Sequence, residues 1–104
     1  MINYSIIIPT YNEEHDIAAT LHALLRQTYL QYEVIVVDDS TDATREIVRD
    51  FHDERIKLIA PKYPVGRCGA RNIGIMEAVG TVVVILNADV LLPPEFLAKI
   101  DLHY

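Results

Sequence analysis

The 104-residue sequence contains a single cysteine, Cys68, and no tryptophan. One cysteine can form neither an intrachain disulfide nor a thiolate metal cluster, which agrees with a reducing compartment. Basic residues are also few, nine against fifteen acidic ones, so the formal net charge is −6. Because the basic residues are scattered along the chain, the sequence lacks the cluster of positive charge that is typical of a nucleic-acid-binding protein.

Long apolar runs are absent as well. The run Ile6–Ile8 ends at Pro9 and has no basic region before it, so we expect neither a signal peptide nor a membrane span. The fractions of 51% hydrophobic and 23% charged residues are those of an ordinary globular domain. We therefore expect a soluble, cytoplasmic protein with one domain over residues 1–104 and a single core.

Short apolar runs alternate with segments of helical periodicity. The predicted strands are Tyr4–Ile8, Glu33–Val37, Ile56–Ala60 and Thr81–Leu86, and the predicted helices cover about 13–27, 42–51, 70–79 and the residues from 95 onward. This alternation predicts an α/β fold with a doubly wound, mainly parallel sheet of about four strands and helices on both faces. We expect the first strand to lie beside the second and the fourth, and the fourth, the most continuous apolar run, to be the most central.

Acidic residues follow two of these strands at the point where each ends. Asp38 and Asp39 come after Glu33–Val37, and Asn87-Ala88-Asp89 comes after Thr81–Leu86. Ligands of open parallel sheets bind at the carboxyl ends of the strands. Carboxylates gathered there repel one another unless a cation or a hydrogen-bond-donating ligand lies between them. The sequence therefore predicts a ligand site at this edge of the sheet.

Five segments carry a likeness that covers nearly the whole chain. They are Ile7–Glu14 (IIPTYNEE), Leu24–Tyr29 (LLRQTY), Val34–Asp42 (VIVVDDSTD), Gly69–Gly74 (GARNIG) and Leu86–Leu97 (LNADVLLPPEFL). In this order and spacing they resemble the N-terminal, Rossmann-like nucleotide-binding half of the family-two glycosyltransferases, which are inverting enzymes of the GT-A fold. The resemblance implies a transferase part that binds a UDP- or GDP-type sugar donor with a divalent metal, Mg²⁺ or Mn²⁺.

The resemblance also implies roles for single residues near the first two strands. Pro9, Thr10 and Tyr11 would lie along the base and ribose, and Glu13 would belong to the same nucleoside-binding turn. Asp39 would accept the ring N–H of uracil or guanine, a donor that adenine lacks. Asp38 is the better candidate for a structural role. The alternative for both acids is capping of the helix that follows them.

Three more residues complete the implied site. Arg71 would lie near the pyrophosphate, or would instead pair with the acidic residues after the second strand. Asp89 would bind the metal that bridges the donor diphosphate, with a simple turn residue as the alternative. Asn87 replaces the first Asp of the family's Asp-x-Asp motif and would bind ribose hydroxyls. Because the site has lost negative charge, we expect weaker metal binding.

The general base of inverting transfer comes from the second half of the family's catalytic domain. We therefore expect no catalytic residue within these 104 residues, and weak or no activity of the chain by itself. An open strand edge predicts a homodimer or higher oligomer, and a full-length form could associate peripherally with a membrane. The alternatives are a non-catalytic interaction module on the same scaffold and a receiver-like signalling domain. A receiver would carry its acidic pair after the first strand, where this sequence has Pro9–Asn12.

Overall fold

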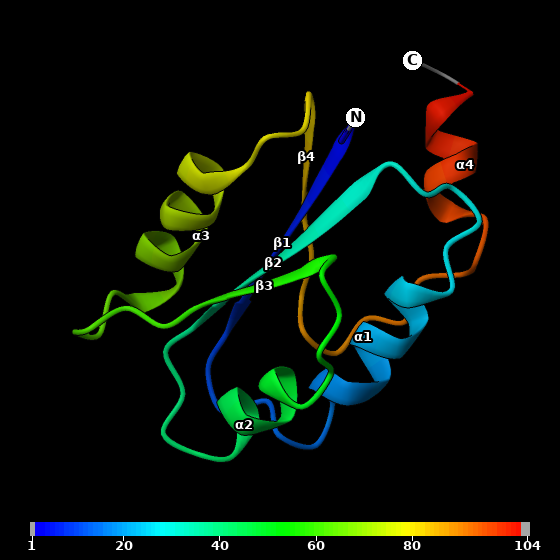
Figure 1. Ribbon diagram of the computed structural model, residues 1–104. Coiled ribbons are helices and arrows are strands. Elements are labelled where there is room, and N and C mark those ends of the chain that lie inside the picture. Colours follow the sequence, from blue (N-terminus) through cyan, green and yellow to red (C-terminus); the bar gives the residue numbers. More distant parts are fainter. Residues whose placement is uncertain (1, 103–104) are drawn as a thin grey trace.

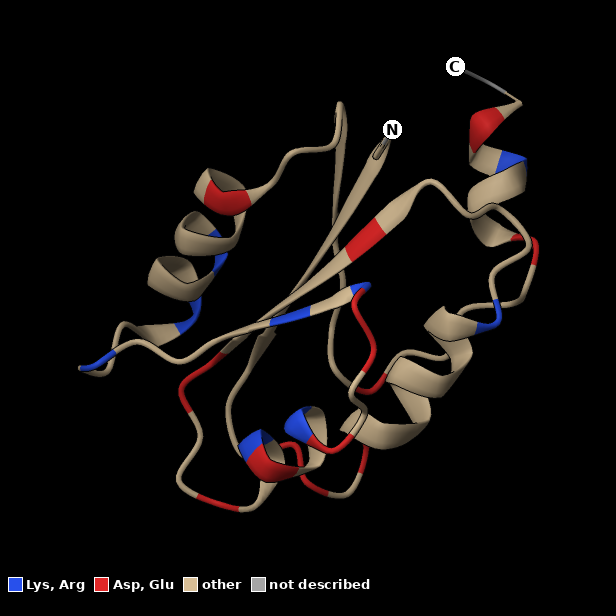
Figure 2. Cartoon of the chain, viewed as in Figure 1, with Lys and Arg blue, Asp and Glu red and all other residues tan. Residues whose placement is uncertain are grey.

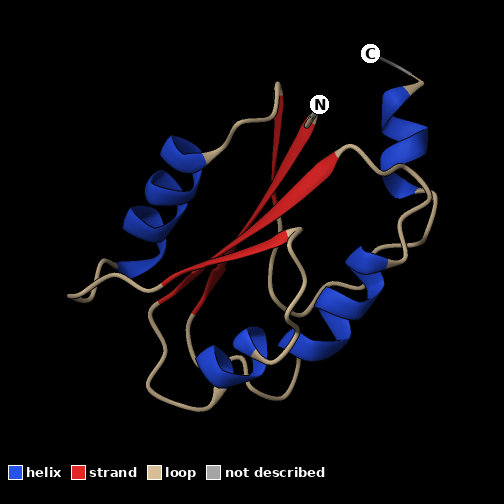
Figure 3. Ribbon diagram, in the orientation of Figure 1, coloured by secondary structure: helices blue, strands red, loops and turns tan. Residues whose placement is uncertain are grey.

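The computed structural model describes residues 2–102, in which strands and helices alternate (Figures 1 and 3). The elements are β1 (Tyr4–Thr10), α1 (Ile17–Leu25), β2 (Tyr32–Asp38), α2 (Thr44–Arg49), β3 (Ile56–Ile59), α3 (Gly66–Glu77), β4 (Val82–Ile85) and α4 (Phe96–Asp101). All strand pairs are parallel, in the order β3-β2-β1-β4. This confirms the predicted α/β fold, with β1 between β2 and β4. Residues 1 and 103–104 of the predicted domain lie outside the described residues.

The two central strands are buried along their whole length. They pair in register from Tyr4 opposite Tyr32 to Thr10 opposite Asp38. Their near-continuous apolar sequences suit this position, because helices cover both faces of the sheet. Figure 1 shows α3 on one face and α1, α2 and α4 on the other. The carboxyl ends of β1 and β2 therefore meet side by side at one edge.

The larger core lies between the sheet and the helices α1, α2 and α4. Its buried apolar members include Ile6, Ile8, Ile17, Leu21, Leu24, Val34, Val36, Val48 and Leu97. In α1 the buried residues recur every three to four positions, which is the spacing of one helix face. Each fully buried Leu or Ile contributes about 1.5–3 kcal/mol relative to exposure. No helix within residues 2–102 is both long and apolar enough to cross a membrane.

Helix α3 packs closely on the opposite face. A Cβ atom at Gly74 would collide with Cγ2 of Ile7 in β1, so only glycine permits this approach. Ala70, one turn earlier, is buried in the same small core with Ile35 and Val37. This contact fixes the helix against β1 and β2 and brings its first turn to the carboxyl edge of the sheet.

The prediction that Thr81–Leu86 is the most central strand is wrong. Strand β4 pairs with β1 and lies at the end of the sheet. Its residues Val83 and Ile85 are 38% and 40% exposed. They stand in register with Ser5 and Ile7, and so they face the side of the sheet that α3 covers at β1 and β2. Apolar periodicity describes the two faces of a strand, but it does not identify its neighbours, so it could not place β4.

Two helices begin elsewhere than the sequence predicts. Helix α1 begins at Ile17 with Asp16 as N-cap, although we expected a start at about residue 13. Helix α3 begins at Gly66, and we expected about Ala70. Gly66 has a φ of +70°, which glycine adopts without the steric cost of a side chain. The chain can therefore turn directly from the loop into the helix.

Candidate functional site

A cavity of about 370 Å³ opens at the carboxyl edge of the sheet, between the end of β1 and the start of α3. It is lined by Pro9, Thr10, Tyr11, Glu13, Asp39, Pro64, Gly66, Arg67 and Ala70. Its size is that of a small-molecule site. Five of the residues predicted from the sequence, Pro9, Thr10, Tyr11, Glu13 and Asp39, thus lie around one cavity.

The other three predicted residues, Arg71, Asn87 and Asp89, are not among the described residues that line it. Two of them interact with a lining residue. Arg67 donates a hydrogen bond from its guanidinium to the side-chain oxygen of Asn87, and Asp89 acts electrostatically on Glu13. The segment after β4 therefore adjoins the side of the cavity formed by Glu13 and Arg67.

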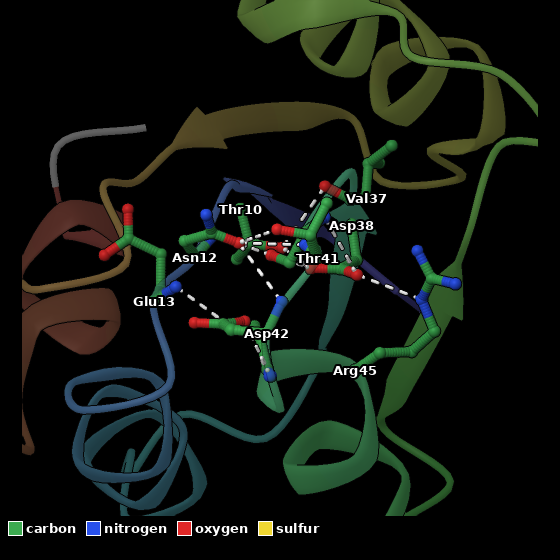
Figure 4. A network of polar contacts seen from close by, with 10 residues as sticks. Thr10, Asn12, Glu13, Val37, Asp38, Thr41, Asp42 and Arg45 are labelled. Atoms are coloured by element: carbon green, nitrogen blue, oxygen red, sulfur yellow. Dashed lines mark hydrogen bonds and ion pairs between the residues drawn. The ribbon is translucent and has the colours of Figure 1, made fainter.

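Asp38, at the end of β2, is fully buried and is held by the chain itself. It accepts hydrogen bonds from Thr10 Oγ1 at 2.7 Å, from Ser40 Oγ at 2.6 Å and from Arg45 Nε at 3.0 Å (Figure 4). This is the structural role that the sequence favours for Asp38. Among the described residues its basic partner is Arg45, and the ion pairs within residues 2–102 include none between Arg71 and Asp38 or Asp39.

Asp39 is held differently, at the rim of the cavity. Its Oδ2 accepts hydrogen bonds from the backbone N–H groups of Val65 and Gly66, both at 3.2 Å. Its own N–H donates to the carbonyl of Thr10 at 3.0 Å. The other oxygen, Oδ1, has no hydrogen-bond partner within residues 2–102. The carboxylate is thus fixed in place while one oxygen remains for a ligand.

Asn12 joins the loops that follow β1 and β2, a role that the sequence analysis missed. It has a φ of 54°, a conformation that asparagine tolerates better than most residues. Its Oδ1 accepts hydrogen bonds from the N–H groups of Thr41 at 2.8 Å and Asp42 at 3.2 Å (Figure 4). Next to it, Glu13 N–H donates to Thr44 Oγ1 at 2.9 Å. These bonds fix the turn that carries Tyr11 and Glu13 into the cavity.

The electrostatics of the cavity combine carboxylates with one lining arginine. Figure 2 shows acidic positions in the loops at the carboxyl edge and basic positions along α3. Burial raises the pKa of Glu13, the nearby charge of Asp89 raises it further, and Arg67 partly offsets the effect. Arg67 was missed because the sequence placed it in a loop. With the correct helix start, its spacing of four from Arg71 puts both arginines on one face of α3.

Arg71 has an unusual environment for an arginine. Its Nε is buried and has no hydrogen-bond partner among the described residues. An unpaired buried N–H costs about 1–3 kcal/mol, and most such groups in proteins find an acceptor. An acceptor supplied by a ligand would remove this cost.

The acidic residues fit a metal that is shared with a ligand. Within residues 2–102, no three His, Cys, Asp or Glu side chains are grouped so that they could hold a metal ion by themselves. Mg²⁺ at phosphate-transfer sites commonly uses one or two carboxylates together with phosphate oxygens. Asp89, with Glu13 nearby, matches a site of this kind, in which phosphate oxygens complete the set of metal ligands.

Comparison with known proteins shows the family. The family model described as Glycosyl transferase family 2 matches residues 5–100. The UDP-Glc:alpha-D-GlcNAc-diphosphoundecaprenol beta-1,3-glucosyltransferase WfgD of Escherichia coli is 45% identical over 86 residues, which are 82% of this chain and 34% of that protein. The putative teichuronic acid biosynthesis glycosyltransferase TuaG of Bacillus subtilis is 39% identical over 88 residues, 82% of this chain and 35% of that protein. The chain thus spans about a third of the length of these curated relatives.

Solved structures agree with the same assignment. The crystal structure of S. aureus TarS 1-349 in complex with UDP-GlcNAc matches with a TM-score of 0.91 and 31% identity, over 97% of this chain and 30% of that one. The mannosyltransferase PcManGT from Pyrobaculum calidifontis, in complex with GDP-Man and Mn²⁺, matches with a TM-score of 0.80 and 36% identity, over 88% of this chain and 28% of that one. These matches decide against a receiver-like signalling domain. By its sequence and its fold, the chain belongs to glycosyl transferase family 2.

Proposed function

We propose that the chain is the donor-binding part of an inverting glycosyltransferase and that its cavity holds the nucleoside diphosphate of a UDP- or GDP-sugar. The observation that carries this proposal is the hydrogen bonding of the Asp39 carboxylate. One of its oxygens is held by two backbone N–H groups, and the other has no partner within residues 2–102. A carboxylate oxygen so placed can accept the ring N–H of uracil or guanine, whereas adenine has a ring acceptor at the corresponding position.

The lining of the cavity supports a nucleoside in this orientation. Tyr11 is 63% exposed at its rim, so its ring can pack against a base or ribose. Pro9 and Thr10 line the same wall. Among the structural neighbours, TarS 1-349 forms complexes with UDP and with UDP-GlcNAc, and the mannosyltransferase forms one with GDP-Man. Both donor types therefore stay within the proposal.

The diphosphate would extend from the nucleoside toward Glu13, Arg71 and the segment after β4. We assign Asn87 to the ribose hydroxyls, Arg71 to the pyrophosphate, and Asp89 to a Mg²⁺ or Mn²⁺ ion shared with phosphate oxygens. A divalent metal held there would stabilise the negative charge that the leaving nucleotide acquires. The chain's own residues orient the donor, and the unpaired Arg71 Nε gains an acceptor.

Calorimetric titration tests the proposal with UDP, GDP and ADP, each in the presence of Mn²⁺. We expect binding of UDP or GDP and much weaker binding of ADP. Asp39→Asn should weaken binding roughly 10- to 100-fold, because a hydrogen bond to a charged acceptor is worth about 1.5–3 kcal/mol. Asp50→Asn, at an exposed acid at the end of α2, is the matched control. Equal binding of UDP by Asp39→Asn and Asp50→Asn would contradict the role of Asp39. If the wild-type chain binds none of the three nucleotides, the result would favour a non-catalytic interaction module.

We also propose that the chain alone binds its donor without efficient transfer, because the general base is expected outside these 104 residues. Its exposed apolar side chains at α3 and β4 support self-association. They include Ile75 and Met76 in α3, Val79 between the two elements, and Val83 and Ile85 in β4, which is an edge strand of the sheet formed by the described residues. Sedimentation is expected to show a dimer or higher oligomer. A monomer at high concentration would contradict this part of the proposal.

A further inference from the structure

Arg67 is the basic residue among the described residues that line the cavity. It lies in the first turn of α3 and lines the cavity together with Glu13 and Asp39. Its guanidinium donates to the side-chain oxygen of Asn87, in the segment after β4. One side chain therefore connects the wall of the nucleoside cavity with the segment that carries the proposed metal ligand, Asp89.

The charges around Arg67 explain why a cation is needed there. Asp89 and Glu13 repel each other, as the raised pKa of Glu13 shows after the effect of burial, and Arg67 acts in the opposite direction. A donor diphosphate would bring further negative charge to the same place. Since the described residues hold no group of three metal ligands, a metal ion there would depend largely on the phosphates themselves. A fixed positive charge from the protein would then provide part of the neutralisation.

The partner of Arg67 is one that a phosphate can replace. Asn87 offers a neutral amide oxygen, and a hydrogen bond from a guanidinium to an ionised oxygen is about twice as strong. The planar guanidinium can also bind two phosphate oxygens at once. Arg71 lies one turn further along the same helix face, and its buried Nε has no partner among the described residues. Arg67 therefore provides the guanidinium that lines the cavity, and Arg71 follows it on the same helix face.

We propose that Arg67 binds the donor diphosphate and that its charge makes nucleotide binding by this chain only partly dependent on a divalent metal. This inference rests on the proposed function and concerns the same cavity. Arg67 exchanges the oxygen of Asn87 for a phosphate oxygen when the donor enters. In the metal-free state Arg67 supplies the main positive charge at the diphosphate, and with metal present it shares this task.

Titration of UDP and GDP in Mn²⁺ and in EDTA tests the proposal on wild type, Arg67→Gln, Arg67→Lys and Asn87→Asp. We expect wild type to keep measurable binding in EDTA, within about tenfold of its affinity in Mn²⁺. Arg67→Gln should lose at least about tenfold in EDTA and clearly less in Mn²⁺. Arg67→Lys should retain part of the metal-free binding, because it keeps the charge without the planar fork. Asn87→Asp should increase the dependence on metal, because a carboxylate holds Arg67 in an ion pair and offers a second metal ligand.

Arg49→Gln, an exposed arginine in the last turn of α2, is the control for loss of one positive charge. If Arg67→Gln and Arg49→Gln bind alike in both solutions, or if wild type binds only with metal, the inference about Arg67 is wrong while the proposed donor site stands. If Asp39→Asn weakens binding but Arg67→Gln does not, the same conclusion follows. If wild type binds no nucleotide in either solution, both proposals fail. Should Arg67→Gln not fold, which circular dichroism would show, Arg67→Lys and Asn87→Asp still decide the question.

Discussion

Strand β2 carries a buried acid at each end, Glu33 at its start and Asp38 at its close, and the two ends differ in what they leave unpaired. In the parallel register Glu33 lies opposite Ser5, and Asp38 lies opposite Thr10. Each acid accepts a hydrogen bond from the hydroxyl of its neighbour, at 2.6 and 2.7 Å. Each also pairs with one basic side chain. The same arrangement thus secures both ends of the central strand pair.

At the Glu33 end the hydrogen bonds form one local network within the protein. Glu33 also accepts from Lys57 Nζ and from the N–H of Val79, both at 2.8 Å, and Gly80 N–H donates to Ser5 Oγ at 2.8 Å. At the Asp38 end the structure continues into the cavity. There, Asp39 Oδ1 and Arg71 Nε have no partners within residues 2–102. The comparison teaches that one end serves folding alone, while the other adds groups that a ligand can satisfy.

The largest effect should come from Asp38→Ala. Removing this buried carboxylate leaves Thr10 and Ser40 without their acceptor and Arg45 without its counter-charge, which we expect to cost about 3–5 kcal/mol of unfolding free energy. Asp39→Ala should cost much less, about 1 kcal/mol, because the hydrogen bonds it removes are half-exposed. Urea denaturation measures both. Equal losses for the two variants would break the distinction between a structural and a ligand-binding acid.

A smaller effect is expected from Glu33→Gln, at about 1.5–3 kcal/mol near neutral pH. Burial opposes ionisation of Glu33, but hydrogen bonds from Lys57, Ser5 and Val79 N–H outweigh it, so its pKa is lower than the ordinary value of 4.5. Its contribution to stability is therefore present above pH 4.5 and is lost as the pH falls through the lowered value. The difference in unfolding free energy between wild type and variant should shrink over this acid range. A difference that stays constant down to about pH 3 would contradict the argument.

Gly66→Ala should cost about 1–2 kcal/mol, because alanine at a φ of +70° is strained. The same change would disturb the N–H that holds Asp39, and so nucleotide affinity should fall together with stability. Gly66→Asn is the matched variant, since asparagine tolerates this conformation and should recover much of both. Thermal melting and titration with UDP measure the pair. If alanine and asparagine behave alike, backbone conformation is not what fixes Asp39.

The smallest effect, and of opposite sign, is expected from Glu13→Gln. Burial and the charge of Asp89 raise the pKa of Glu13 in the folded protein, so wild type loses stability as the pH rises from the ordinary value through the raised one. Glutamine removes this loss and should stabilise the protein at neutral pH by about 0.5 kcal/mol. Glu95→Gln, at an exposed residue just before α4, should change little. Destabilisation by Glu13→Gln would show that Glu13 resembles Glu33, and would weaken the contrast between the two ends.

The central part of this structure could be predicted because its physical signals are local. The apolar runs of β1 and β2, each followed by polar residues, indicated buried parallel strands and the edge where Asp39 lies. The neighbour of β4 was predicted correctly from the topology of doubly wound sheets, but its place at the end of the sheet was not, since an apolar run does not show whether a strand has a second neighbour. Arg67 was missed for a local reason, because two prolines and two glycines between 61 and 69 suggested a longer loop. The role of Asn12 could not be predicted from local signals, because its bonds reach residues 41 and 42 in another loop.

These bonds of Asn12 have a consequence for the energetics of recognition. The loops after β1 and β2 are already joined to each other before any donor arrives, so their ordering entropy is lost during folding and not at the moment of binding. Affinity at this half of the cavity then reflects contacts alone, and association needs no rearrangement of these turns. The cavity is in this sense preorganised where the loops after β1 and β2 meet.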